Sequence, residues 1–158
     1  MKVKIKRLHP NAVIPSYAKA GDAGMDLTAI SMKIDEYGNI CYGIGLAFEI
    51  PEGYVGLVFP RSSNCKKDVI LTNCVGVIDS GYRGEVSFKF RPSPSQAIKI
   101  YEDDGEYLCS DSVDNNTYKI GDRIGQIIIM PYPQIEFEEV EELSETERGE
   151  GGYGSSGR

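Results

Sequence analysis

The stretch EVSFKF at residues 85–90 alternates polar and apolar side chains with a period of two. Such alternation is typical of a β-strand with one face against a core and the other in water. Short runs rich in Ile, Val, Phe, Tyr and Thr recur between turn residues at 3–6, 25–30, 39–50, 54–59, 74–78, 97–101, 117–120 and 124–130. The pattern predicts an all-β sandwich or barrel, with at most one short helix at residues 62–68.

Turn residues predict how these strands connect. PEGY at residues 51–54 predicts a β-hairpin between the apolar runs on either side of it. Residues 71–86 are interpreted as a second hairpin, and residues 101–116 as an exposed acidic hairpin excursion between two core strands. We divide the chain into a β domain at 1–133, an acidic extended arm at 134–147 and a glycine-rich mobile tail at 148–158.

Charge and hydropathy exclude several classes of partner. The 158 residues carry a formal net charge of −7, and residues 134–150 alone hold eight acids against one base. Nucleic-acid binding and docking on anionic membranes both need many basic side chains, so neither partner is expected. No apolar run approaches the ~20 residues of a membrane span, and the N-terminus lacks the apolar core of a secretory signal. We expect a cytoplasmic protein, or one of the host cytoplasm if the gene is viral or from a phage.

The numbers and spacing of cysteine and histidine residues exclude several kinds of metal site and catalytic mechanism. Cys41, Cys65, Cys74 and Cys109 form no CxxC pair and no zinc spacing, so reduced, mostly buried thiols are expected. The single histidine, His9, argues against Ser-His-Asp or Cys-His catalysis. The remaining candidates for hydrolytic chemistry are carboxylates, arginines, hydroxyls, backbone amides and a metal ion.

Two segments place polar groups beside strands. AGDAGMDL at residues 20–27 sets Asp26 after small residues, where a ligand can approach the backbone, although a glycine-rich turn with a solvated Asp fits equally. A PRSS sequence sets Arg61, Ser62 and Ser63 after a strand. Arg61 and the amides that follow it can hold a phosphate. Alternatively, Ser62 or Ser63 only caps the short helix.

A third segment, residues 71–86, combines an amide, a carboxylate and a ring. Asp79 follows the apolar Val77-Ile78 pair, which predicts partial desolvation and a raised basicity. Asn73 offers the donor and acceptor that an amide-bearing base requires, and Tyr82 supplies an aromatic face. A hairpin whose Asp and Gly only make the turn competes with this interpretation.

The fourth segment is the tail at residues 148–158. Glycines combined with Arg148, Tyr153 and two serines suit a flexible lid over a polyphosphate nucleotide. A disordered end or an engineered linker explains the same composition.

In this order, the segments resemble the five motifs of the trimeric dUTPase (dUTP diphosphatase) family. The motifs are AGDAGMDL (20–27), PRSS (60–63), GVID with YRGE (76–79 and 82–85), GDRIGQ (121–126) and RGEGGYGSSG (148–157). The resemblance implies a β jelly roll, a homotrimer with active sites at subunit interfaces, and Mg²⁺-dependent hydrolysis of dUTP to dUMP and pyrophosphate. That reaction keeps uracil out of DNA and supplies dUMP for thymidylate synthesis.

Roles for single residues follow from the same resemblance. Asp79 is implied as the general base for the water that attacks the α-phosphorus, and Asp26 as a contact of Mg²⁺ through water. The base and sugar are assigned to Asn73, Gly76, Val77, Ile78, Tyr82 and Tyr153. The phosphates are assigned to Arg61, Ser62, Ser63, Gln126, Arg148, Ser155 and Ser156. Arg123 with Asp122 is interpreted as structural.

Some features depart from the family or leave alternatives open. Gly125 stands where Ala is common, which we expect to be a small change, and Tyr153 stands where Phe is common. Some phage members carry an insert that engages a protein partner where residues 101–116 lie; an inert loop is favoured here over a regulatory role. A dCTP deaminase would need a Glu on the strand after the third motif, and residues 86–90 contain none.

Overall fold

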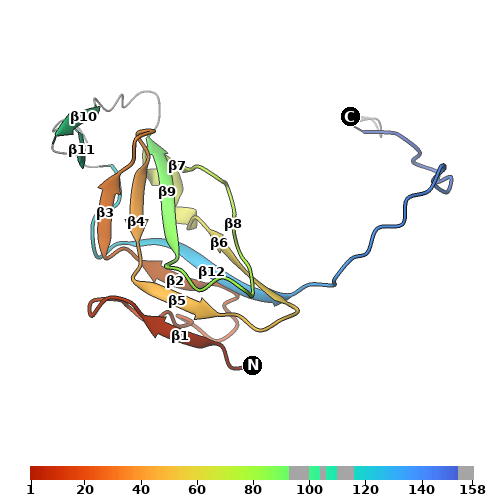
Figure 1. Cartoon of the computed structure of the whole chain (residues 1–158), viewed down its shortest axis with the longest axis horizontal. Helices are drawn as coiled ribbons and strands as arrows, with labels where there is room; N and C mark the ends of the chain where they lie inside the picture. The colour runs from red at the N-terminus through yellow and green to blue at the C-terminus, as the bar shows by residue number, and fades with distance from the viewer. Residues whose placement is uncertain (93–99, 104–105, 110–115, 153–158) are drawn as a thin grey trace.

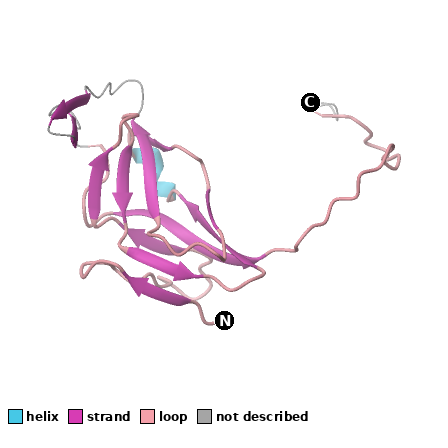
Figure 2. Ribbon diagram, viewed as in Figure 1, coloured by secondary structure: helices cyan, strands magenta, loops and turns pink. Residues whose placement is uncertain are grey.

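The computed structural model describes residues 1–92, 100–103, 106–109 and 116–152 (Figure 1). Its elements are β1 (Lys4–Arg7), β2 (Met25–Thr28), β3 (Ser31–Ile34), β4 (Ile40–Gly43), β5 (Leu46–Glu49), β6 (Tyr54–Phe59), the 3-10 helix η1 (Ser62–Lys66), β7 (Val69–Leu71), β8 (Gly76–Ile78), β9 (Ser87–Pro92), β10 (Ile100–Asp103), β11 (Glu106–Cys109) and β12 (Arg123–Pro131). The all-β prediction is confirmed, and the predicted short helix is a single 3-10 turn (Figure 2).

Two four-stranded antiparallel sheets form the body of the molecule, in the jelly-roll arrangement that the resemblance implied. One sheet has the order β2-β12-β6-β8 and the other β3-β4-β9-β7. β1 pairs with β5, and β10 pairs with β11 in the predicted acidic hairpin. No helix among the described residues is long and apolar enough to cross a membrane.

The core lies between the two sheets and follows from the alternation in β9. Phe88 and Phe90 point inward and are almost fully buried, while Ser87 and Lys89 face water. The rings of Phe88 and Phe90 stack with centroids 6.1 Å apart, and Tyr42 meets Phe90 edge-on at 6.0 Å. Aromatic side chains of this size contribute most of the apolar area that a small core buries.

Both predicted core hairpins are wrong. A Pro51–Tyr54 turn does form, with the Tyr54 N–H donating to the Pro51 carbonyl at 3.1 Å, but β5 pairs with β1 whereas β6 pairs with β12 and β8. The strands predicted on either side of the turn in residues 71–86 are likewise unpaired, because β8 lies in one sheet and β9, which follows the turn, lies in the other. In a two-layer sandwich these turns carry the chain from one sheet to the other, so their flanking strands never pair.

Several strand boundaries also differ from the prediction. The run at 39–50 breaks into β4 and β5 at Gly45, whose φ of 66° only glycine adopts freely. Residues 117–120 are not a strand, because they turn into β12 instead. β3 and β7 were not predicted. The strand expected at 97–101 is described only from β10 onward.

The cysteines are less buried than expected. Cys41 is buried, but Cys65 and Cys74 are exposed, and all three are free thiols. Cys65 lies in η1, and Cys74 lies in the turn before β8 with a φ of 59°. η1 buries none of its residues and the turn before β8 lies at the surface, which explains why thiols there escape burial.

Gly125 is not an incidental departure from the family pattern. A methyl group at this buried position of β12 would collide with the Phe88 ring and would lie 2.9 Å from the Phe59 carbonyl oxygen. Phe88 is itself 1% exposed. The large ring therefore fills the space that an alanine methyl would need, and the expectation of a small change is wrong.

Replacing Gly125 with Ala is expected to lower the free energy of unfolding by about 1–3 kcal/mol, the usual cost of overpacking a core. Urea unfolding at fixed protein concentration measures this loss. Adding Phe88→Leu should recover part of it, because the ring contact disappears while the Phe59 carbonyl stays. Gly81→Ala is the matched control, since open space surrounds that glycine; an equal loss there would contradict the packing explanation.

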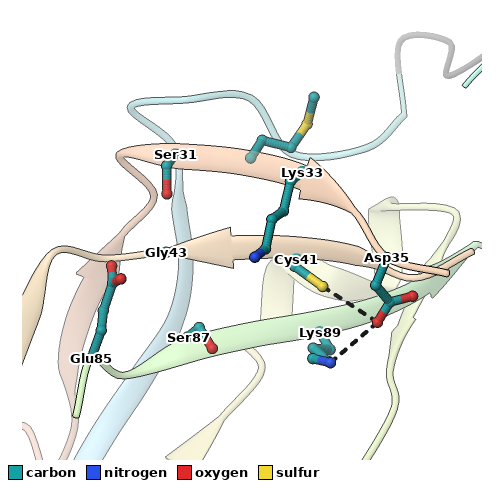
Figure 3. A pocket seen from close by; sticks show the side chains of 9 residues that line it. Ser31, Lys33, Asp35, Cys41, Gly43, Glu85, Ser87 and Lys89 are labelled. Carbon is teal, nitrogen blue, oxygen red and sulfur yellow. Dashed lines mark hydrogen bonds and ion pairs between the residues drawn. The ribbon is translucent and has the colours of Figure 1, made fainter. Parts of the chain in front are cut away.

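Asp35 organises the β3–β4 turn and one end of a polar groove on the outer sheet face (Figure 3). Its carboxylate accepts the backbone N–H groups of Tyr37 (3.1 Å) and Asn39 (2.9 Å), the Cys41 thiol (3.5 Å) and the Lys89 ammonium (3.2 Å). Burial alone would raise the pKa of Asp35, but the Asn39 and Lys89 donors outweigh it and hold that pKa well below its usual range. The groove, of about 390 Å³, holds none of the predicted site residues.

Asp35→Asn is expected to destabilise the protein at pH 7 by about 1–2 kcal/mol, because charge-assisted hydrogen bonds are lost. Since the folded pKa is depressed, the stabilisation is complete above the unfolded pKa of about 3.9 and disappears as the pH falls through the folded value. Urea unfolding at several pH values should show the variant and the parent converging below about pH 4. Glu49→Gln, which breaks the exposed Lys4–Glu49 pair, is the control and should change little. A difference that persists undiminished to pH 2 would count against this role.

Candidate active site

One cluster of site residues is built around the Asp26 carboxylate. Arg61 donates from Nε to Oδ1 at 2.7 Å and from Nη2 to Oδ2 at 3.4 Å, and Arg123 donates from Nη1 to Oδ2 at 3.0 Å. β12 lies between β2 and β6, so Gln126 pairs with Asp26 on one side and with Phe59 on the other. This register brings residues from the first, second and fourth motifs together, as the resemblance predicted.

Hydroxyl and amide groups complete this cluster. Ser63 Oγ accepts from Arg61 Nη1 at 3.3 Å, and Gln126 donates from Nε2 to the Pro60 carbonyl at 3.2 Å. The Gln126 amide lies against the bare backbone of Gly24, where any side chain would displace it. The N-cap of η1 is Arg61 and no side chain caps the turn, so the alternative that Ser62 or Ser63 serves as the cap is wrong.

Asp26, Arg61, Arg123 and Gln126 line an open cavity of about 380 Å³. Its lining comprises Ser16, Ala18, Asp22, Ala23, Gly24, Asp26, Arg61, Ser62, Arg123, Gln126 and Ile128. The two guanidinium groups of the lining are balanced in formal charge by Asp22 and Asp26, and Ser62 adds an exposed hydroxyl. The cavity therefore offers guanidinium and hydroxyl donors to the oxygens of an anion, without a net positive charge of its own.

Sequence reasoning missed two members of this cavity. Arg123 was interpreted as structural, yet it binds the same carboxylate as Arg61. Asp22 lines the cavity while its carboxylate accepts the Lys19 N–H at 2.8 Å. Both residues lie within motif segments, so the available signal was their spacing from Asp26 and Gln126 along neighbouring strands. Asp122 does have the structural role expected, because it accepts the Lys119 N–H at 2.8 Å.

A second cluster forms where β8 ends. Val77, Ile78, Asp79 and Tyr82, with Glu85, Val86 and Ser87, line a cavity of about 170 Å³. The Tyr82 hydroxyl donates to the Glu85 carbonyl at 2.9 Å, and its ring lies against Gly84, where an added Cβ would be 2.6 Å from Cζ. The hydroxyl end of the Tyr82 ring is therefore held against Gly84 and Glu85 within a single chain.

Asp79 and Asn73 are exposed in the single chain. Val77 is likewise 61% exposed, so the apolar neighbours predicted to desolvate Asp79 do not cover it. Asn73 lies beside Gly76, with Nδ2 3.4 Å from the point where a Gly76 Cβ would sit, and does not line the cavity of Asp79. The expected desolvation of the carboxylate is therefore absent within one chain.

The two clusters lie near opposite ends of β6. Ile78, next to Asp79, pairs with Gly56, whereas Arg61 follows Phe59 by two residues. The three steps from Gly56 to Phe59 span about 10 Å of strand. The two cavities share no lining residue. A single chain therefore presents the cluster around Asp26 and the carboxylate–tyrosine cluster around Asp79 as separate half-sites.

The chain beyond β12 leaves the body (Figure 1). Phe137 is 92% exposed and Leu143 87% exposed in the acidic arm. Arg148 makes only a local contact among the described residues, from Nε to the Gly151 carbonyl at 2.9 Å. The predicted site residues Tyr153, Ser155 and Ser156 lie outside the described residues.

The donor set near Asp26 fits one kind of metal site. Among the described residues, no group of three or more His, Cys, Asp or Glu side chains is arranged to hold a metal ion. Asp22 and Asp26 are the carboxylates of the cavity, and Asp26 is already paired with two arginines. This set fits Mg²⁺ that takes most of its ligands from substrate phosphates and water, which is the usual manner of Mg²⁺ at triphosphate sites.

Solved structures share this fold. The dUTPase of Staphylococcus bacteriophage 80alpha with dUPNHPP has a TM-score of 0.76 and 30% sequence identity, and the match covers 99% of each chain. A mutant dUTPase from phage phi11 of S. aureus, described with a structural Mg(II) ion, has a TM-score of 0.67 and 28% identity. That match covers 90% of this chain and 99% of the phage chain.

Sequence relatives agree with the structural neighbours. The family model described as dUTPase matches residues 10–104 and 107–157. The deoxyuridine 5'-triphosphate nucleotidohydrolase of Nautilia profundicola is 39% identical over 160 residues and 100% of both chains. The same enzyme of Rhodococcus erythropolis is 38% identical over 160 residues, covering 99% of this chain and 87% of the relative. With five motifs in order, two half-sites built from them and relatives matched from end to end, this chain belongs to the dUTPase family.

Proposed function

We propose that this protein hydrolyses dUTP to dUMP and pyrophosphate, a reaction that keeps uracil out of DNA and supplies dUMP for thymidylate synthesis. The observation that carries the proposal is the pair of complementary half-sites: a cavity lined by Arg61 and Arg123, and a second one where Tyr82 lies beside Asp79. The first suits a triphosphate, and the second suits a base and sugar next to a carboxylate. Membership in the dUTPase family supports this substrate.

In the phosphate half-site, Asp26 orients the Arg61 guanidinium before the substrate binds. Asp26 occupies the Nε and Nη2 edge of Arg61, which leaves Nη1 for Ser63 and for an incoming phosphate oxygen. Ser62 and Gln126 add a hydroxyl and an amide at the same cavity. Donors that are already oriented stabilise charge on the leaving pyrophosphate without reorganising during the reaction.

The base-and-sugar half-site supplies specificity and the general base. Asp79 takes a proton from water as the water oxygen bonds to the α-phosphorus, and the bond from that phosphorus to the pyrophosphate oxygen breaks. The fixed Tyr82 ring packs under the deoxyribose and leaves no room for a 2′-hydroxyl. The backbone of Gly76–Ile78 and the Asn73 amide read the uracil edge, and Tyr153 covers the ring.

Asp26 and Asp22 would hold a Mg²⁺ ion at this cavity, and the ion would supply positive charge that neutralises the phosphates. Asp26 fits a contact through water better than a direct one, because both of its oxygens already accept from arginines. Asp22 adds a second carboxylate at the same cavity. Arg123 joins Arg61 in holding Asp26, so both arginines set the position of this contact.

Separate half-sites in one chain support a homotrimer whose active sites form between subunits. We propose that Arg61 of one subunit and Asp79 of a neighbour face the same dUTP molecule. The exposed arm, with Phe137 and Leu143 in water, then lies over a neighbouring subunit and delivers Arg148, Ser155 and Ser156 to the γ-phosphate. Contact with the neighbour and the tail also removes water from Asp79, which supplies the desolvation that one chain lacks.

Pyrophosphate release from dUTP, UTP, dCTP and dTTP tests the activity. The wild-type protein should turn over dUTP alone, and Asp79→Asn should lower kcat by about 100-fold or more because proton transfer to the base is lost. Glu36→Gln, an exposed carboxylate in the β3–β4 turn, is the matched control and should keep full activity. Comparable hydrolysis of UTP, full activity in Asp79→Asn, or ammonia release from dCTP would overturn the proposal.

Mixing two inactive chains tests where the half-sites meet. Asp79→Asn and Arg61→Ala chains are unfolded, mixed in equal amounts and refolded together. If the halves come from different subunits, about a quarter of the sites formed at random carry both native residues and activity returns. Each variant refolded alone is the control and should stay inactive. No activity in mixed assemblies would place both halves of the site within one chain.

A further inference from the structure

The 3-10 turn η1, which we propose to bind phosphate, has few stabilising contacts of its own. This 3-10 turn carries Ser62 and Ser63 directly after Arg61, yet it has no side-chain cap and buries none of its own residues. Short 3-10 turns are weak because their hydrogen bonds have poor geometry. Contacts from outside the turn must therefore help to fix Arg61 and Ser62, which line the cavity, and Ser63, which accepts from Arg61.

Asn64 provides those contacts from the middle of the turn. Its Oδ1 accepts the Tyr118 hydroxyl at 3.0 Å, and its Nδ2 donates to the Val69 carbonyl at 3.1 Å. Its backbone N–H donates to the Arg61 carbonyl at 2.9 Å. Only this orientation of the amide satisfies both side-chain partners, because a hydroxyl can donate and a carbonyl can only accept. The Asn64 side chain thus ties the turn to β7 and to Tyr118.

Tyr118 is a rigid attachment point for this bond. It is 3% exposed, its ring lies 5.3 Å from that of Phe90, and its carbonyl accepts the Tyr42 hydroxyl at 2.7 Å. Lys67 covers the ring with Nζ at 5.3 Å from the centroid and donates to the Thr117 carbonyl at 2.8 Å. Burial raises the pKa of the Tyr118 hydroxyl, so it remains a protonated donor at neutral pH.

We propose that the Tyr118–Asn64 hydrogen bond positions Arg61, Ser62 and Ser63 for binding the triphosphate. Asn64 and Tyr118 are positioning residues: Tyr118 lies in the core, outside the five motifs, and neither residue lines the cavity at Asp26. The bond joins the aromatic core to the mouth of the phosphate half-site. This inference rests on the proposed function, because it assigns these residues a role in binding the phosphates of dUTP.

If the Tyr118–Asn64 bond positions η1, its loss should weaken the binding of dUTP, which carries phosphates, and leave the binding of deoxyuridine unchanged. A loosened turn must be ordered again when the triphosphate binds, which weakens its affinity. Deoxyuridine has no phosphate, so its affinity depends only on the half-site around Tyr82 and Asp79. A residue that merely stabilised the fold would weaken both ligands alike or neither.

Tyr118→Phe removes the hydroxyl and keeps the buried ring. We expect the KM for dUTP, and the Kd for a non-hydrolysable dUTP analogue, to rise about 5- to 10-fold, the effect of one lost hydrogen bond. The inhibition constant of deoxyuridine should stay within about twofold. Asn39→Ala is the matched control for Asn64→Ala, because Asn39 also hydrogen-bonds through both of its amide atoms, to Asp35 and Arg91, but lies in the β3–β4 turn and not in η1. Circular dichroism and urea unfolding check that each variant is folded.

Asn64→Ala is the second variant, and it keeps the test available if Tyr118→Phe does not fold. It should reproduce the selective loss, and the double variant should be no weaker than Asn64→Ala alone, because one interaction is removed twice. Unchanged dUTP affinity in folded variants, or equal losses for dUTP and deoxyuridine, would overturn the inference. Failure of the wild-type protein to hydrolyse dUTP would instead overturn the proposed function.

Discussion

The pairing of β6 with β12 on one side and β8 on the other is the constraint on which the site depends. Because the strands are antiparallel, β12 brings Gln126 and Asp26 to the end of β6 where Arg61 follows, and β8 carries Asp79 toward the opposite end. The same register that builds each half-site also keeps the two apart in one chain. This separation is the basis of our proposal that one nucleotide bridges two copies of the chain.

The strand content was predictable because the apolar period of two in β9 is local, and the core formed on Phe88 and Phe90 as expected. Which strands pair with each other was not predictable from the turn sequences. PEGY makes a tight turn in either case, but only the competition among all strands for the two sheets decides that β5 joins β1. The role of Arg123 was missed for the same reason, since its contact with Asp26 spans 97 residues of sequence.

Side chains of the hydrophobic core pack directly against the segments that carry the candidate site residues. Phe88 presses on the bare backbone of Gly125, one residue before Gln126, while Tyr118 packs on Phe90 and reaches the phosphate turn. The motifs hold the residues that we propose to contact the ligand. Phe88, Tyr118 and Asn64, which pack against those segments or hydrogen-bond within them, lie between the motifs, where the resemblance assigns no roles.

The acidic residues of the arm affect the aggregation of free chains, independently of substrate binding. Ile135, Phe137 and Leu143 stand in water along an extended segment, and a bare row of such side chains would promote aggregation while a new chain awaits its partners. Glutamates stand between these apolar positions, and like charges repel one another when two free arms approach. We therefore expect the negative charge of the arm to limit aggregation of free chains until the arm packs on a neighbouring subunit, as proposed above.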